Sequence, residues 1–234
     1  MRIHQLGIAV FLVAITASVL AAPNIVTFRP IGKPATQAPF SSQEIIAQAK
    51  LVQKCDPIPT KAMTLVPAAA VSSRIKRLFD EDQQARMVDK IDWNTLQRTD
   101  QIRRQEVIQY ILLDQLSTDA DFVGAGFIYQ HGSCANSYLL AHQLAGYAIA
   151  LGEGIIAKGE YAQTSRWLYA ATWDRYLLNT GTAQRFGTQY TSIGSECKFE
   201  LEPFDPATTD EERQQYNVPT LENAKAQAAT FKCP

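Results

Sequence analysis

The chain has 234 residues, with 22 Lys and Arg against 23 Asp and Glu, which gives a formal net charge of −1. This near-neutral balance argues against binding along a nucleic-acid backbone, which needs a clustered cationic face. It also argues against adhesion to anionic lipid. The length suffices for one domain with a substantial core. We therefore expect no nucleic-acid partner.

The N-terminal residues have the three-part pattern of a secretory signal peptide. Arg2 and His4 form a short basic head, an apolar run covers residues 6–20, and a small residue follows at Ala21. The alternative is an uncleaved membrane anchor, but such an anchor needs roughly 20 apolar residues to cross a bilayer. We predict a signal peptide over residues 1–21, cleaved near Ala21. The mature chain is then periplasmic or secreted, without stable membrane insertion.

Four cysteines, Cys55, Cys134, Cys197 and Cys233, lie in the mature part. An even number in an exported chain favours disulfide bonds, with three possible pairings. We favour Cys134–Cys197, because both flank the central segments, and Cys55–Cys233, because both belong to peripheral segments. Their spacing is too wide for a structural zinc site. We expect neither a metal nor a cofactor.

The N-terminal part of the mature chain divides into two segments. Residues 22–40 are rich in Pro, Thr and Ala, which predicts an extended, disordered leader. Residues 41–72 contain a helix from Ser42 to about Cys55 and a proline-containing linker. The remaining residues, 73–234, form the predicted helical domain.

The spacing of apolar residues in this domain is predominantly helical. We expect a charged, solvent-facing helix over 74–90, and then a helix that Asp100 caps. Arg98, Arg103 and Arg104 alternate with acidic residues there, which is typical of a solvated helix face. Further helices are predicted over 119–130, 135–151, 165–179, 210–215 and 221–230, with a short strand or hairpin arm over 197–201. The fold class is therefore mainly α, a single-domain helical bundle with a small β-hairpin element near the C-terminus.

Three polar clusters interrupt or follow the apolar helices. They are Gln130-His131-Gly132, Asp174-Arg175, and the loop from Gln184 to Gln189. A carboxylate and a guanidinium within an apolar helix are costly unless they are paired. We therefore expect the three clusters to meet in space.

Five ordered sequence blocks carry a resemblance to a bacterial domain of unknown function, number six-six-two-four. The blocks are RRQEVIQYIL, DFVGAGFIYQHG, AHQLAGYAIALGE, WLYAATWDRYLLNTGTAQRFGTQY and DEERQQYNVPTL. The resemblance covers roughly two thirds of the chain and implies no established activity. The positions that it marks are Gln130, His131, Asp174, Arg175, Gln184, Gly187, Thr188 and Gln189. Cys134 departs from the family pattern.

Each candidate residue has a catalytic or a structural interpretation. His131 suits a general base, because its ordinary pKa lies near neutrality, or it is a helix-end histidine bonded to a carbonyl. Asp174 or Gln130 could orient this histidine, and Arg175 could bind a carboxylate or phosphate. Alternatively, Asp174 and Arg175 hold the neighbouring loop. Because adjacent residues on a helix face different directions, they should have different partners.

The loop has the same two interpretations. Gln184, Thr188 and Gln189 could bind a small polar or anionic ligand, or they could satisfy buried helix ends. Two functions follow, a hydrolase-type enzyme with His131 as base, or a non-catalytic binding or interaction protein. The enzyme requires His131 to be exposed in a cleft on which the loop converges. The other hypothesis requires these groups to be buried and mutually satisfied.

Overall fold

The structure is a computed structural model that describes residues 27–31, 38–57, 63–88, 90–152, 155–157, 163–193 and 198–231. The predicted signal peptide lies outside the described residues, as do Cys197 and Cys233.

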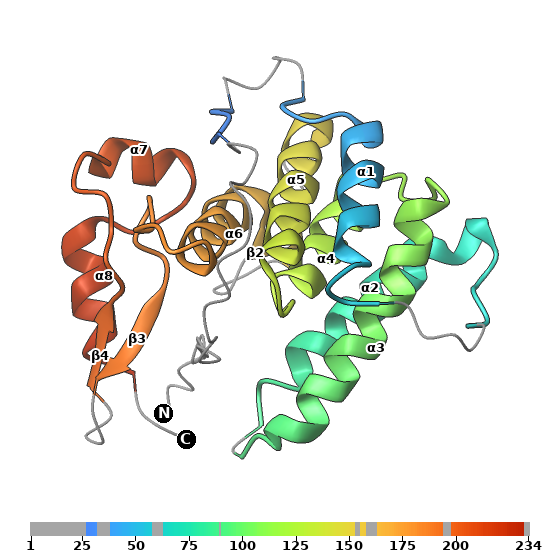
Figure 1. The fold of residues 1–234 in the computed structure, drawn as a ribbon, viewed down its shortest axis with the longest axis horizontal. Helices are drawn as coiled ribbons and strands as arrows, with labels where there is room; N and C mark the ends of the chain where they lie inside the picture. The colour runs from blue at the N-terminus through green and yellow to red at the C-terminus, as the bar shows by residue number, and fades with distance from the viewer. Residues whose placement is uncertain are drawn as a thin grey trace.

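The described part of the chain contains eight α-helices and one short 3₁₀ helix (Figure 1). The helices are α1 (Ser42–Val52), η1 (Ala68–Ala70), α2 (Val71–Gln84), α3 (Trp93–Leu112), α4 (Asp119–Tyr129), α5 (Ala135–Gly152), α6 (Ser165–Asn179), α7 (Asp210–Gln215) and α8 (Leu221–Ala228). The prediction of a mainly α fold is confirmed. None of the helices in the described ranges is long and apolar enough to cross a membrane.

Two small antiparallel hairpins accompany the helices. β3 (Tyr190–Ile193) pairs with β4 (Lys198–Leu201), with Tyr190 opposite Leu201 and Ile193 opposite Lys198. This is the hairpin expected near the C-terminus. β1 (Ile155–Ala157) and β2 (Gln163–Thr164) form a second hairpin that the sequence did not indicate, because strands of two or three residues are too short to show a period.

Helix α4 is the centre of the core, and every residue from Asp121 to Gln130 is buried. It packs against α2 on one side and against α5 on another, and α5 in turn packs against α1 and α6. A helix that is apolar on all sides must be enclosed by others, as α4 is in Figure 1. The C-terminal part, with α7, α8 and the β3–β4 hairpin, lies beside α6 on the side away from α3.

Capping residues define the helix starts. Ser41 and Glu44 form a capping box at α1, and Thr118 and Asp121 form another at α4. The predicted cap at Asp100 is wrong, because α3 begins eight residues earlier, where Asp92 accepts hydrogen bonds from the Asn94 and Thr95 amides.

Helix α2 also differs from its prediction. It is not a solvent-facing helix, because Ile75, Leu78, Phe79 and Asp82 on one face are buried. The expected disordered leader differs as well. Its described residues 27–31 and 38–40 contact the domain, and Phe40 is only 7% exposed.

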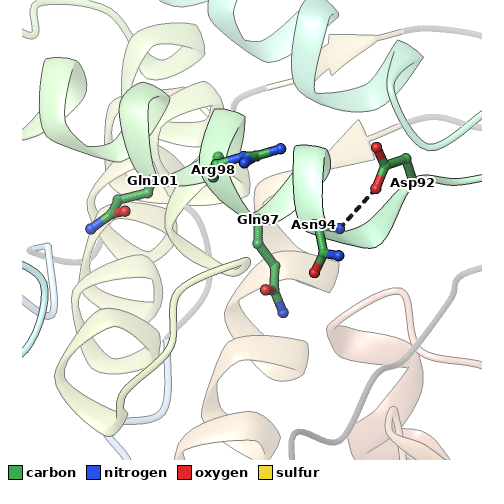
Figure 2. A pocket seen from close by; sticks show the side chains of 5 residues that line it. All are labelled: Asp92, Asn94, Gln97, Arg98 and Gln101. Atoms are coloured by element: carbon green, nitrogen blue, oxygen red, sulfur yellow. Dashed lines mark hydrogen bonds between the residues drawn. The ribbon is translucent and has the colours of Figure 1, made fainter.

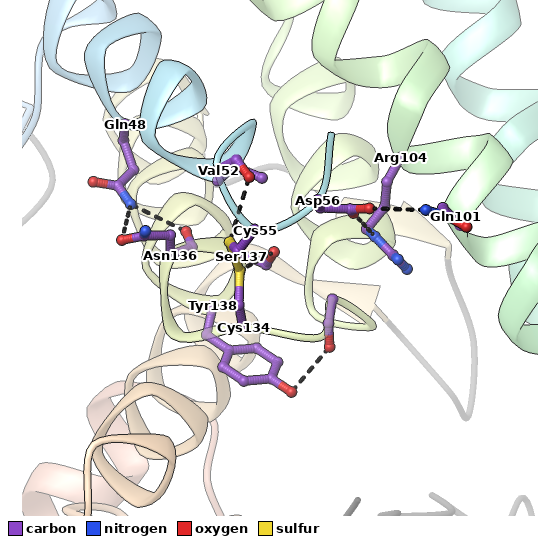
Figure 3. Close-up of a disulfide and its surroundings, with 11 residues drawn as sticks. Gln48, Val52, Cys55, Asp56, Gln101, Arg104, Cys134, Asn136, Ser137 and Tyr138 are labelled. Atoms are coloured by element: carbon purple, nitrogen blue, oxygen red, sulfur yellow. Dashed lines mark hydrogen bonds and ion pairs between the residues drawn. A yellow bond between two sulfur atoms is a disulfide. The ribbon is translucent and has the colours of Figure 1, made fainter. Parts of the chain in front are cut away.

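A disulfide joins Cys55, just after α1, to Cys134, just before α5 (Figure 3). Their Cα atoms are 6.4 Å apart, although 79 residues separate them in sequence. The pairings Cys134–Cys197 and Cys55–Cys233 are therefore both wrong. The bond links two segments of the helical body, whereas the prediction joined each of these segments to the C-terminal region.

Candidate functional site

The carboxylate of Asp174 holds the loop that follows α6. Its Oδ1 accepts hydrogen bonds from the backbone amides of Arg185 and Phe186, at 2.7 and 2.8 Å. Its Oδ2 accepts from the amide and the hydroxyl of Thr188, at 3.0 and 2.7 Å. Asp174 is completely buried. All four hydrogen bonds remain within the protein, so the carboxylate presents no free oxygen to a ligand.

The two glutamines of this loop form hydrogen bonds with each other and with neighbouring segments of the same chain. The Gln184 side chain accepts from the Gln189 amide at 2.9 Å and donates to the carbonyls of Gln189 and Glu202. The Gln189 side chain donates to the Ala171 carbonyl and to the Thr188 hydroxyl. Both glutamines are buried. They therefore satisfy backbone groups of the loop rather than facing solvent.

Gly187 and Arg213 complete the loop. Gly187 has a φ of +71°, and a Cβ at this position would lie 2.7 Å from the Arg213 Nη1 atom. Arg213 is fully buried and donates to the Phe186 carbonyl. The loop needs glycine here for two reasons, its left-handed backbone and the adjacent guanidinium.

Arg175 has a partner on another helix, as expected for a residue adjacent to Asp174. Its Nη1 donates to the carbonyl of Gln130 at the end of α4, at 2.9 Å. Burial lowers the pKa of Arg175, but an arginine remains charged at neutral pH. The guanidinium therefore caps the C-terminus of α4, where a cation is favoured by the helix dipole.

His131 lies against α2 and not against Asp174. Its Nε2 is 3.5 Å from the Asp82 Oδ2 atom, and no hydrogen bond or ion pair among the described residues links it to Asp174 or to the loop. The His131 side chain is 17% exposed, but its Nε2 atom is buried and has no hydrogen-bond partner in the described structure. The expected meeting of the three clusters is therefore confirmed in part. The second cluster binds both others, through Arg175 to Gln130 and through Asp174 to the loop, but His131 is not bonded to Asp174 or to the loop.

A network of buried charges surrounds the Asp82 carboxylate. The Arg86 guanidinium lies 3.0 Å from Asp82 and 2.6 Å from Asp100. Arg103 donates to Asp100 at 2.9 Å and also to the Glu81 carbonyl. The network joins the end of α2 to α3, and its side chains are buried except for Arg86, which is 18% exposed.

Arg104 extends this network to the disulfide (Figure 3). Its Nε donates to Asp56, the neighbour of Cys55, at 2.5 Å, and its Nη1 donates to the His131 carbonyl at 2.8 Å. Arg103 and Arg104 are 8% and 5% exposed. The prediction that they belong to a solvated helix face is therefore wrong, because their charges are paired with aspartates and carbonyls of other segments.

Burial controls the protonation of the three central groups. It raises the pKa of Asp82 to about 7, although the charges of Arg86 and Arg103 oppose this shift. Burial, followed by the charge of Arg86, lowers the pKa of His131 well below its usual value. Burial also raises the pKa of Asp174 to about 6, although its four hydrogen bonds act to lower this pKa. At neutral pH His131 is therefore uncharged and Asp174 is ionised.

Two hollows at the surface of the described residues lie elsewhere. One, of about 510 Å³, is open and polar and is lined by Asp92, Asn94, Gln97, Arg98 and Gln101 on α3 (Figure 2). The other, of about 10 Å³, is lined by Ser42, Ile45, Ile46, Ile111, Asp114, Leu116 and Phe122. Neither is lined by His131, Asp174 or the loop, so neither provides a substrate site for these residues.

Sequence reasoning missed the network residues Asp56, Asp82, Arg86 and Asp100. One signal could have indicated two of them, since Asp82 and Arg86 are four residues apart. Asp82 also falls on the apolar face of α2, where a carboxylate needs a partner. No family of known proteins is identified for the chain, because no family model, curated protein or solved structure matches it. The resemblance to the bacterial domain of unknown function therefore stays a prediction.

Proposed function

We propose that this chain is an exported, non-catalytic binding or interaction protein, in which the candidate residues maintain the fold. The observation that carries the proposal is the complete use of the Asp174 carboxylate by the loop after α6. A catalytic carboxylate that orients a histidine must contact the histidine, and Asp174 is bonded only to loop groups. Arg175 is likewise bonded to a backbone carbonyl, so it is not directed at an anionic ligand.

The hydrolase hypothesis would use His131 together with Asp82. Their 3.5 Å contact is not a hydrogen bond, and the His131 Nε2 atom has no hydrogen-bond partner among the described residues, so Asp82 does not fix the ring as the carboxylate of a catalytic triad does. A general base must come within hydrogen-bond reach of the proton that it abstracts. The two hollows described above are not lined by His131, so neither of them gives this histidine access to a substrate.

Export is part of the same proposal. The disulfide between Cys55 and Cys134 is compatible with an oxidising compartment, where such bonds persist. Together with the signal-peptide pattern of residues 1–21, it supports delivery to the periplasm or beyond.

Substitution of His131 tests the proposal. We expect His131→Ala to lower the free energy of unfolding by about 1–3 kcal/mol, because it removes a half-buried ring from the network. The melting temperature should then fall by roughly 2–12 °C. The control is Gln97→Ala, at an exposed position on α3, which should leave the melting temperature unchanged. Hydrolysis of p-nitrophenyl acetate and p-nitrophenyl phosphate is measured on the same samples. Turnover by the wild type that His131→Ala abolishes without changing the melting temperature would contradict the proposal.

A further inference from the structure

Phe28 is inserted among five aromatic side chains, which we call the aromatic seat. The seat consists of His142, Tyr169, Trp173, Phe186 and Tyr216. The ring centroid of Phe28 lies between 5.4 and 6.1 Å from each of the five others, at tilted or edge-on angles. These are the favoured separations and geometries of aromatic pairs. The seat is therefore shaped for one aromatic side chain.

The seat draws its members from distant parts of the fold. His142 belongs to α5, Tyr169 and Trp173 to α6, and Phe186 to the loop that Asp174 holds. Tyr216 directly follows α7. In Figure 1 the short segment of residues 27–31 lies beside α6, between α5 and α7. A large part of the domain thus contributes to the enclosure of a single ring.

The backbone around Phe28 is held by tyrosine hydroxyls. Tyr169 donates its hydroxyl to the Arg29 carbonyl, and the Ile31 amide donates to the Tyr216 hydroxyl at 3.3 Å. Residues 27–31 have no helical or strand structure, and their backbone makes no hydrogen bond to the backbone of another described residue. The segment is therefore held as a bound peptide would be, by an anchoring ring and side-chain bonds to its main chain.

Two arginines form cation–π contacts at the aromatic seat and in the segment that it binds. The Arg185 guanidinium lies over the Phe28 ring, 4.5 Å from its centroid. Arg29, the next residue of the segment, lies over the Phe40 ring at 5.3 Å and donates to the Pro39 carbonyl at 2.7 Å. The site thus accepts an aromatic residue followed by a basic one, and cation–π contacts stabilise both.

We infer that the aromatic seat is a peptide-binding site, occupied here by residues 27–31 of the same chain. Its partner is another protein that presents an extended segment with an aromatic residue followed by arginine. This inference rests on the proposed binding function and names its site and ligand. Phe28 is partly exposed, and Thr27, Arg29 and Pro30 are exposed, so the segment lies at the surface of the domain, where another peptide can compete for the same position.

Residues 27–31 should compete with a free peptide for the aromatic seat, and they have an advantage because they belong to the same chain as the seat. A segment within the same chain has an effective concentration that is commonly millimolar, so it reduces the apparent affinity for any free peptide. A variant that removes the anchoring ring should therefore bind the free peptide more tightly than the wild type does.

The test uses the full mature chain and the peptide Thr-Phe-Arg-Pro-Ile, which copies residues 27–31. We expect Phe28→Ala to bind this peptide at least roughly tenfold more tightly than the wild type, because the competing segment is released. Titration calorimetry measures the affinity, and Trp173 fluorescence reports whether the peptide reaches the seat. The matched peptide Thr-Ala-Arg-Pro-Ile should not bind. Circular dichroism verifies that the variant keeps its helical content.

If Phe28→Ala fails to fold, the wild type provides the same test. Excess peptide should then accelerate hydrogen exchange of the Ile31 amide by displacing the segment. Equal affinity for the two peptides, or no binding by any chain, would overturn the inference. A concentration-dependent dimer that the peptide dissociates would also overturn it, because the partner would be a second copy of this chain. None of these results alters the His131→Ala test, so the proposed function fails or stands separately.

Discussion

Removing the Asp174 carboxylate should destabilise the fold more than any other single change at the candidate site. Asp174→Ala leaves three backbone amides and the Thr188 hydroxyl without their acceptor. A buried donor without a partner costs about 1–3 kcal/mol, and part of this cost disappears because a charge is no longer buried. Water that enters the space of the missing carboxylate recovers a further part. We therefore expect a loss of roughly 3–5 kcal/mol in the free energy of unfolding.

Urea denaturation followed by far-ultraviolet circular dichroism measures this loss directly. In a chain of this size, 1 kcal/mol shifts the melting temperature by roughly 2–4 °C, so a decrease of roughly 6–20 °C should accompany it. Asp205→Ala is the control, because Asp205 is exposed and accepts one backbone hydrogen bond, from Ala207. It should cost less than about 1 kcal/mol. A loss below about 1 kcal/mol for Asp174→Ala would refute the view that this carboxylate holds the loop.

Three further predictions concern other parts of the molecule. Burial lowers the pKa of His142 to about 3, so the unfolded chain binds a proton that the folded chain excludes. When the pH drops from 6.5 to 4, the free energy of unfolding should therefore fall by about 3 kcal/mol more in the wild type than in His142→Phe. Equal losses for the two proteins in pH-dependent denaturation would contradict this prediction. Gly187→Ala should destabilise the fold by about 1–3 kcal/mol, more than Gly181→Ala, which has a similar φ but open space around it; equal melting temperatures would count against the close contact. Cys197 and Cys233 should form a second disulfide, because the bond between Cys55 and Cys134 leaves each of them only one possible partner within the chain. Peptide mapping without reduction detects this bond, and free thiols at both positions would exclude it.

Local sequence signals predicted most of the helices, because their causes are local. Capping residues such as Thr118 and Thr164 determine where α4 and α6 begin. Asp100 misled the prediction, because an aspartate between a polar stretch and an apolar helical pattern resembles an N-terminal cap. Its actual role depends on Arg86, which lies just after the end of a different helix, α2. The start of a helix can be inferred from a few residues, but a salt bridge between helices cannot.

The buried charge network could not be derived from the sequence for the same reason. Arg103 and Arg104 have the spacing of a solvated helix face, and only the position of α2 and of the segment after α1 encloses them. The disulfide pairing also depends on which helix ends the fold brings together. Cys55 and Cys134 meet because α1 packs against α5, a contact that no local pattern predicts.

The adjacent residues Asp174 and Arg175 show that a sequence can indicate a buried polar junction without identifying the partners in it. Sequence reasoning correctly inferred that both needed buried partners and that these partners would differ. Both side chains bind mainly backbone groups, since Asp174 accepts from three amides and Arg175 donates to the carbonyl of Gln130. A backbone partner leaves no trace in the sequence, because every residue except proline offers the same amide and carbonyl. Polar residues buried on an apolar helix therefore indicate that a junction exists, and its chemistry depends on whether the partners are side chains or main chain. Here they are mainly main chain, so α6 connects the end of α4 to the loop that carries Phe186 of the aromatic seat.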